Sequence, residues 1–134
     1  MKITLCSSTK FFYKLPEIKS ELEKRGFEVF LPVMEDFSKD GEHANEKIHH
    51  DLIRKHFRKI DKSEAIYVAN YDKNGIEGHI GGNCFLEMGK AFDKGIPIFL
   101  MKDHPKEVGY KDELIALQPV IVGQDWDKIK ELVS

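Results

Sequence analysis

The feature that most constrains the fold is the unbroken apolar run over residues 65–69, Ala-Ile-Tyr-Val-Ala. A strand with one face in water alternates apolar and polar side chains, whereas a strand covered on both faces is apolar along its whole length. Strands of the second kind are typical of parallel sheets, whose crossover connections place helices on both faces. Residues 65–69 therefore predict a central strand of a parallel sheet.

Shorter apolar runs predict four more strands, and amphipathic segments lie between them. These strands are expected over residues 3–6, 28–31, 97–101 and 120–122. The helices are expected over about 15–25, 45–62, 84–93, 112–117 and 126–133, with a polar turn at 7–10 and a loop over residues 33–44.

The alternation of strands and helices predicts an α/β fold with right-handed crossovers. We expect a doubly wound, five-stranded parallel sheet between two helical layers. This is a flavodoxin-like (Rossmann-like) three-layer sandwich with strand order 2-1-3-4-5. Because 134 residues is the usual size of one domain, residues 1–134 are expected to form a single domain.

Composition argues against two classes of partner. The 21 basic and 23 acidic residues are interspersed and give a net charge of -2, so no basic patch is expected to neutralise the phosphates of duplex nucleic acid. No apolar run approaches the ~20 residues that a membrane-spanning helix needs. Cys6 and Cys84 are expected to be reduced thiols, and an early strand stands where a secretory leader would lie, which favours a cytoplasmic location.

In the expected strand order, ligands bind at the carboxyl ends of the first and third strands, where residues 6–12 and 70–83 form loops. The second loop ends in Gly81, Gly82 and Asn83. Two residues without a Cβ bring backbone N–H groups close to an anion, and the following helix adds a partial positive charge. A phosphate or a sugar hydroxyl would fit here. An ordinary turn into a helix would have the same sequence.

Glu87 follows this turn by about one helical turn, and helical side chains lean toward the helix N-terminus. We expect its carboxylate to stay ionised at neutral pH because the helix end favours an anion. It could then act as a nucleophile or stabilise a developing cation. The alternative is a surface glutamate that complements the helix dipole, and the apolar neighbours Leu86 and Met88 argue against it.

Three segments around these loops resemble one known family. They are residues 6–10 (Cys-Ser-Ser-Thr-Lys), 65–70, and 82–89 (Gly-Asn-Cys-Phe-Leu-Glu-Met-Gly). The resemblance is to the nucleoside 2-deoxyribosyltransferases and their nucleoside 5′-monophosphate N-glycosidase relatives, over about residues 2–101. It implies that Glu87 attacks the anomeric carbon, that the nucleobase leaves, and that the glycosyl group passes to water or another base. It also implies no cofactor and a homodimer or larger homo-oligomer.

The resemblance carries over to further residues, with two departures. His56 stands where the family commonly has an assisting Asp, and Gly81 and Gly82 stand where the transferases have acidic residues that contact the base. Lys10 falls where the monophosphate-cleaving relatives have a basic residue, which favours a phosphorylated substrate. His56 is interpreted either as a general acid near neutral pH or as a half-exposed residue on a basic helix face.

Polar residues of the two loops complete the candidate site. Ser7 and Ser8 are expected to join Lys10 around the phosphate. Asn70, at the strand end, is expected to point into the crevice. Asp72 is either a ligand of the ribose or base, or a turn-forming residue.

No metal site is assigned, because His49 and His56 lie two helical turns apart and no zinc-type spacing is present. Cys84, near the helix start, has either a lowered pKa or a small buried side chain under the glycine turn. Two main hypotheses remain: an enzyme that cleaves or exchanges an N-glycosidic bond, and a non-catalytic nucleotide-binding module of the same fold. A flavin-binding electron carrier is suggested by topology alone.

Overall fold

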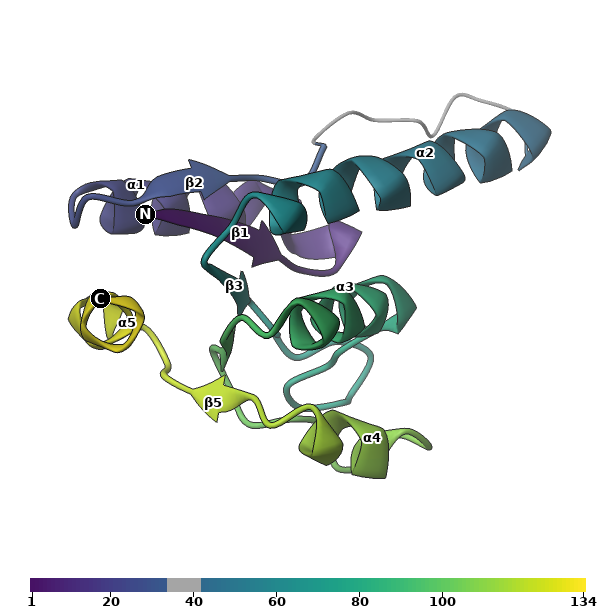
Figure 1. The fold of residues 1–134 in the computed structure, drawn as a ribbon. Helices are drawn as coiled ribbons and strands as arrows, with labels where there is room; N and C mark the ends of the chain where they lie inside the picture. The colour runs from purple at the N-terminus through teal and green to yellow at the C-terminus, as the bar shows by residue number, and fades with distance from the viewer. Residues whose placement is uncertain (34–41) are drawn as a thin grey trace.

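The computed structural model describes residues 1–33 and 42–134. Its centre is a five-stranded parallel sheet in the order β2-β1-β3-β4-β5 (Figure 1). The strands are β1 (Lys2–Cys6), β2 (Glu28–Phe30), β3 (Ala65–Val68), β4 (Ile98–Leu100) and β5 (Val120–Ile121). The predicted fold class and strand order are therefore confirmed. All four residues of β3 are buried, as expected for a strand covered on both faces.

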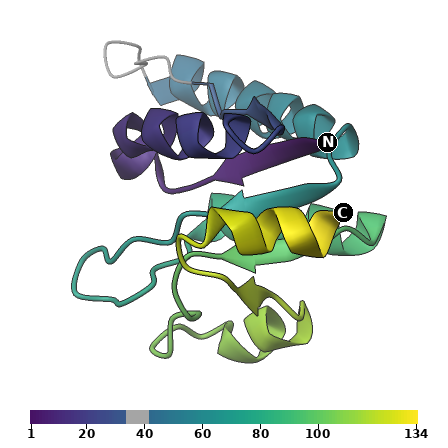
Figure 2. The same ribbon diagram turned by 90° about the vertical axis from the view of Figure 1, so that its left-hand side faces the viewer.

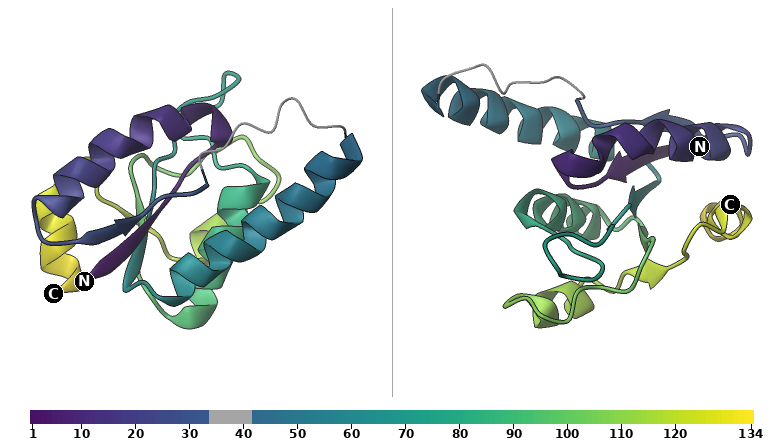
Figure 3. Two further views of the ribbon diagram at one scale, coloured as in Figure 1. Left: turned by 90° about the horizontal axis from the view of Figure 1, so that it is seen from above. Right: turned by 180° about the vertical axis from the view of Figure 1, so that it is seen from behind.

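Helices cover both faces of the sheet, which makes three layers (Figures 2 and 3). One face is covered by α1 (Leu15–Glu23) and α5 (Trp126–Val133), and the other by α2 (Glu42–Asp61), α3 (Gly82–Lys94) and α4 (Lys111–Ala116). Successive side chains of β1 point to opposite faces of the sheet and therefore pack against different helices. Ile3 and Leu5 pack with α1 and α5, whereas Cys6 packs with α2 and α3. The sheet thus directs Cys6 toward the two longer helices.

The helix boundaries differ from the expected ones in two places that affect the site. Helix α3 begins at Gly82, two residues earlier than predicted, so Glu87 lies in its second turn. A 3-10 helix, η1 (Thr9–Lys14), follows β1 where a polar turn was expected, and the side chain of its Phe11 is buried. The loop predicted over residues 33–44 lies mostly outside the described residues, and α2 already begins at Glu42.

The loops after β3 and β4 are locked together by Asn70, which is 2% exposed. Its side-chain amide donates to the backbone oxygens of Gly78, Lys102 and Asp103, at 3.2, 2.8 and 3.3 Å. Its side-chain oxygen accepts from the Lys102 backbone N–H at 2.9 Å. The loops at the carboxyl edge of the sheet are therefore cross-linked through one side chain.

No helix of the described segments is long and apolar enough to cross a membrane.

Gly78 is required by this arrangement, because its φ is +62° and an added Cβ would lie 2.3 Å from the Asp103 backbone oxygen. We predict that Gly78→Ala destabilises the protein by about 2 kcal/mol or more, since backbone strain and a backbone clash combine. Gly82→Ala is the matched control: its Cβ would meet nothing within 4 Å, so stability should change by less than about 1 kcal/mol. Urea denaturation of both variants measures this. Equal losses of stability would show that the Gly78 turn does not constrain the loop.

Candidate functional site

Three side chains from three elements converge behind the start of α3. Cys6 ends β1, His56 lies on α2, and Glu87 lies on α3. The Cys6 Sγ is 3.6 Å from the His56 Nε2, and this Nε2 is 3.5 Å from the Glu87 Oε2. Packing of α2 against α3 over the same face of the sheet brings the histidine and the carboxyl group together.

The cluster is almost fully buried. Cys6 is inaccessible, the His56 side chain is 5% exposed and the Glu87 side chain is 12% exposed. Burial raises the pKa of Glu87 from 4.5 to about 7 and lowers that of His56 from 6.5 to about 4. Because burial opposes both charges, the proton of this pair lies preferentially on the carboxyl group. The alternative interpretation of His56 as a half-exposed residue on a basic helix face is wrong.

The expectation that the helix end keeps Glu87 ionised is corrected by this environment. The effect of a helix dipole falls off within the first turn, and Glu87 is in the second. Removal of the carboxylate from water therefore outweighs the dipole, and Glu87 is partly protonated at neutral pH. The surface-glutamate alternative fails for the same reason.

Two polar atoms of the cluster have no hydrogen-bond partner among the described residues: the His56 Nδ1 and the Glu87 Oε2. Buried polar groups without partners cost free energy, and most native structures avoid them. The Glu87 carboxyl oxygen is thus buried beside His56 without the hydrogen bond that buried oxygens normally have. These two buried polar atoms without partners are the feature of the site that most directly indicates a functional role.

The residues expected around a phosphate lie in different environments. The Ser7 hydroxyl is buried and donates to the Ala69 backbone oxygen at 2.8 Å, which ties β1 to β3. The Ser8 hydroxyl accepts from the Lys73 Nζ at 2.9 Å. Lys10 is exposed, and its Nζ lies 5.8 Å from the centre of the Phe11 ring. The structure thus adds Lys73 as a second cation beside this loop.

The start of α3 offers backbone donors. Gly81 is the N-cap residue, with extended backbone and no side-chain cap, and Gly82 and Asn83 are exposed. The N–H groups of the first helical turn have no partner within a helix and point outward from its end. Neither glycine has the positive φ that would require it, so open access to the amides is what their missing side chains provide.

Asn70 and Asp72 are engaged within the protein. The Asn70 amide is fully used between the β3 and β4 loops. The Asp72 carboxylate accepts from the Gly78 N–H at 2.9 Å and from the Lys102 Nζ at 3.1 Å, and these bonds lower its pKa. Both residues hold the loops. These bonds support the turn-forming interpretation of Asp72, and its role as a ligand of the ribose or base stays a prediction.

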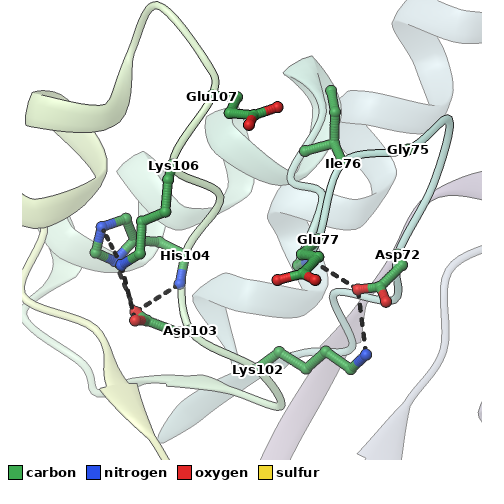
Figure 4. Close-up of a pocket in the computed structure, with 10 residues that line it drawn as sticks. Asp72, Gly75, Ile76, Glu77, Lys102, Asp103, His104, Lys106 and Glu107 are labelled. Carbon is green, nitrogen blue, oxygen red and sulfur yellow. Dashed lines mark hydrogen bonds and ion pairs between the residues drawn. The ribbon is translucent and has the colours of Figure 1, made fainter.

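A cavity of about 620 Å³ opens between the β3 and β4 loops (Figure 4). Acidic and basic side chains line it, and several pair with each other, as Lys102 does with Asp72 and Lys106 with Asp103. Its volume is within the range of small-molecule sites. Asp72 connects this cavity to the loops of the candidate site, although Glu87 does not line it.

Two residues of the site were missed by sequence reasoning. Cys6 was treated only as a reduced thiol, although the alternation of β1 already assigns it to the face that does not carry Ile3 and Leu5. Lys73 lies in a loop whose path the sequence does not reveal. Cys84 is buried and its pKa is raised by burial, so the interpretation as a small buried side chain is confirmed.

Comparison with known proteins gives structural likeness only. No protein-family model and no curated protein sequence matches the chain. Among solved structures, a 2-deoxyribosyltransferase from Bacillus psychrosaccharolyticus matches with a TM-score of 0.58 and 18% identity, over 96% of this chain and 90% of that one. The Clostridium botulinum CMP N-glycosidase BcmB matches with a TM-score of 0.53 and 15% identity, over 98% and 99%. The chain has the fold of these two proteins. The likeness expected from the sequence is thus confirmed at the level of structure.

The raised pKa of Glu87 predicts a pH-dependent stability. The folded state holds the proton more tightly than the unfolded state, so stability is lost as pH rises from about 4.5 to about 7. Glutamine has the same size and cannot ionise. We expect Glu87→Gln to be more stable than the natural protein by about 3 kcal/mol at pH 8, and by much less at pH 5.

Urea denaturation of both proteins at the two pH values measures this difference. Any contribution of His56 is present in both proteins and largely cancels. Glu77→Gln, at an exposed glutamate, is the control and should show no such dependence. A difference for Glu87→Gln that is the same at pH 5 and pH 8 would contradict the assigned burial.

Proposed function

We propose that this protein cleaves or exchanges the N-glycosidic bond of a nucleoside 5′-monophosphate, with Glu87 as the nucleophile. The observation that supports this most is the Glu87 carboxyl group: it is buried beside His56 and keeps an oxygen without a partner among the described residues. The fold shared with a deoxyribosyltransferase and a nucleotide N-glycosidase supports the same chemistry.

The first step requires an ionised Glu87. Transfer of its proton to the His56 Nε2, 3.5 Å from Oε2, gives a carboxylate and an imidazolium without exchange with solvent. The carboxylate oxygen forms a bond to C1′ while the C1′–N bond breaks, and the electron pair of that bond leaves with the base. The base then takes up the proton from the imidazolium.

The second step regenerates the enzyme. Water, or the N–H of an incoming base, attacks C1′ and breaks its bond to the Glu87 oxygen. The proton lost by the attacking group returns to His56, and Glu87 leaves as a carboxylate. Attack by water gives hydrolysis, and attack by a base gives exchange, through the same glycosyl-enzyme.

The phosphate is assigned to the mouth of this site. The Lys73 ammonium at the Ser8 hydroxyl supplies a charge, and the exposed amides at the start of α3 supply donors that favour an anion. Lys10, on the neighbouring η1, remains available to the phosphate from solvent. Charge-assisted hydrogen bonds contribute roughly 1.5 to 3 kcal/mol each, so one of them gives at least a tenfold preference over the nucleoside.

We predict that the protein releases free base from at least one nucleoside 5′-monophosphate, and more slowly from the matching nucleoside. The rate should fall between pH 6 and pH 8, because Glu87, with a pKa of about 7, then loses to solvent the proton that the mechanism passes through His56 to the leaving base. Glu87→Gln should reduce the rate by about a thousandfold or more, because the amide cannot form the glycosyl-enzyme. Chromatography of the released base over a panel of nucleotides measures all three.

The control is Glu77→Gln, which removes an exposed glutamate that lines the nearby cavity and should leave the rate unchanged. A rate for Glu87→Gln equal to that of the natural protein would exclude Glu87 as the nucleophile. If no nucleotide releases base, while nucleotides still bind, the chain is a non-catalytic binding module of this fold.

A further inference from the structure

The cluster behind α3 also has the composition of a metal site. Cys6, His56 and Glu87 each provide one ligand atom, and these atoms all lie within 4.8 Å of one another. Thiolate, imidazole and carboxylate are the three ligand types that bind Zn²⁺ in proteins. The sequence did not reveal this group, because its members come from β1, α2 and α3 rather than from one helix with zinc-type spacing.

The distances fit one ion. With bonds of about 2.3 Å to sulfur and about 2.0 to 2.2 Å to nitrogen and oxygen, neighbouring ligand atoms of a tetrahedral Zn²⁺ site are about 3.3 to 3.6 Å apart. The Cys6 Sγ is 3.6 Å from the His56 Nε2, which in turn is 3.5 Å from the Glu87 Oε2. An ion can therefore contact all three with small movements of the side chains.

Burial supports the same assignment. The Glu87 Oε2 has no hydrogen-bond partner among the described residues, so a cation would satisfy an oxygen that is otherwise left without one. Glu87 is the most exposed of the three side chains, at 12%, and therefore provides the side from which an ion enters. A water molecule or a substrate oxygen would then occupy the fourth position.

We propose that Cys6, His56 and Glu87 form a three-ligand site for Zn²⁺, and that the ion and the sugar substrate compete for Glu87. When Zn²⁺ binds, the Cys6 thiol and any protonated Glu87 release their protons to solvent, and three coordinate bonds form. The oxygen bound to the ion cannot attack C1′. Competition rests on the proposed function, whereas metal binding does not.

Titration of the purified protein with Co²⁺, under a phosphine reductant, tests the site. Co²⁺ replaces Zn²⁺ and reports a sulfur ligand through an ultraviolet charge-transfer band and a tetrahedral site through its visible bands. We expect one Co²⁺ per chain, with both sets of bands, and loss of the bands when one equivalent of Zn²⁺ is added. Absence of the charge-transfer band from the natural protein would overturn the proposal.

Variants identify the ligands. Cys6→Ser should abolish the charge-transfer band, and Glu87→Gln should keep it while the affinity for Co²⁺ falls by more than about tenfold. Cys84→Ser is the matched control: this second buried thiol is on α3 but outside the three-residue group, so its removal should leave both bands in place. A charge-transfer band that survives Cys6→Ser, or that disappears in Cys84→Ser, would assign the metal elsewhere and overturn the proposal.

Two measurements keep the result independent of folding and of the proposed activity. Circular dichroism shows whether each variant is folded, and Glu87→Gln tests the site if Cys6→Ser does not fold.

Base release is then measured with and without Zn²⁺, and should be inhibited by one equivalent of the ion. If the natural protein binds Co²⁺ through Cys6 but releases no base, the metal site stands and the glycosidase proposal fails. Base release without cobalt bands gives the opposite outcome.

Discussion

Burial of the Glu87 carboxyl group against β1 and α2 is the constraint on which the site depends. Its pKa rises from 4.5 to about 7, which corresponds to a cost of about 3 kcal/mol for the ionised form. A surface glutamate at the same helix would avoid this cost. Such perturbed groups are found most often at functional sites, because a group with a pKa near neutrality can exchange its proton during a reaction.

The topology brings the partners of this carboxyl group together. Because β1 and β3 are neighbours in a doubly wound sheet, their loops meet at one edge, and α2 and α3 cover the same face. The alternation of β1 then points Cys6 at this face. In the proposed mechanism His56 takes up the proton that Glu87 must lose, and the Lys73 ammonium at the Ser8 hydroxyl binds the phosphate. The fold thus forms three contacts between residues far apart in the sequence: Cys6 with His56, His56 with Glu87, and Lys73 with Ser8.

The sequence predicted those features that follow from short-range patterns. Apolar runs and amphipathic spacing located the five strands and the helices around them, and the family resemblance identified Glu87 as the candidate residue. What failed depends on tertiary packing. Desolvation of Glu87, burial of His56, the position of Lys73 and the internal bonding of Asn70 arise from elements that meet only in the folded chain.

The central claim is that Glu87 forms a covalent bond to the sugar. Mass spectrometry of protein quenched during reaction with a 2-fluoro nucleotide analogue tests it directly, because fluorine at C2′ slows release of the sugar from the enzyme. The account predicts an adduct with the mass of the fluorinated sugar phosphate on the peptide that contains Glu87, and no adduct in Glu87→Gln. An adduct on another residue, or base release from the analogue with no adduct on any peptide, would contradict it.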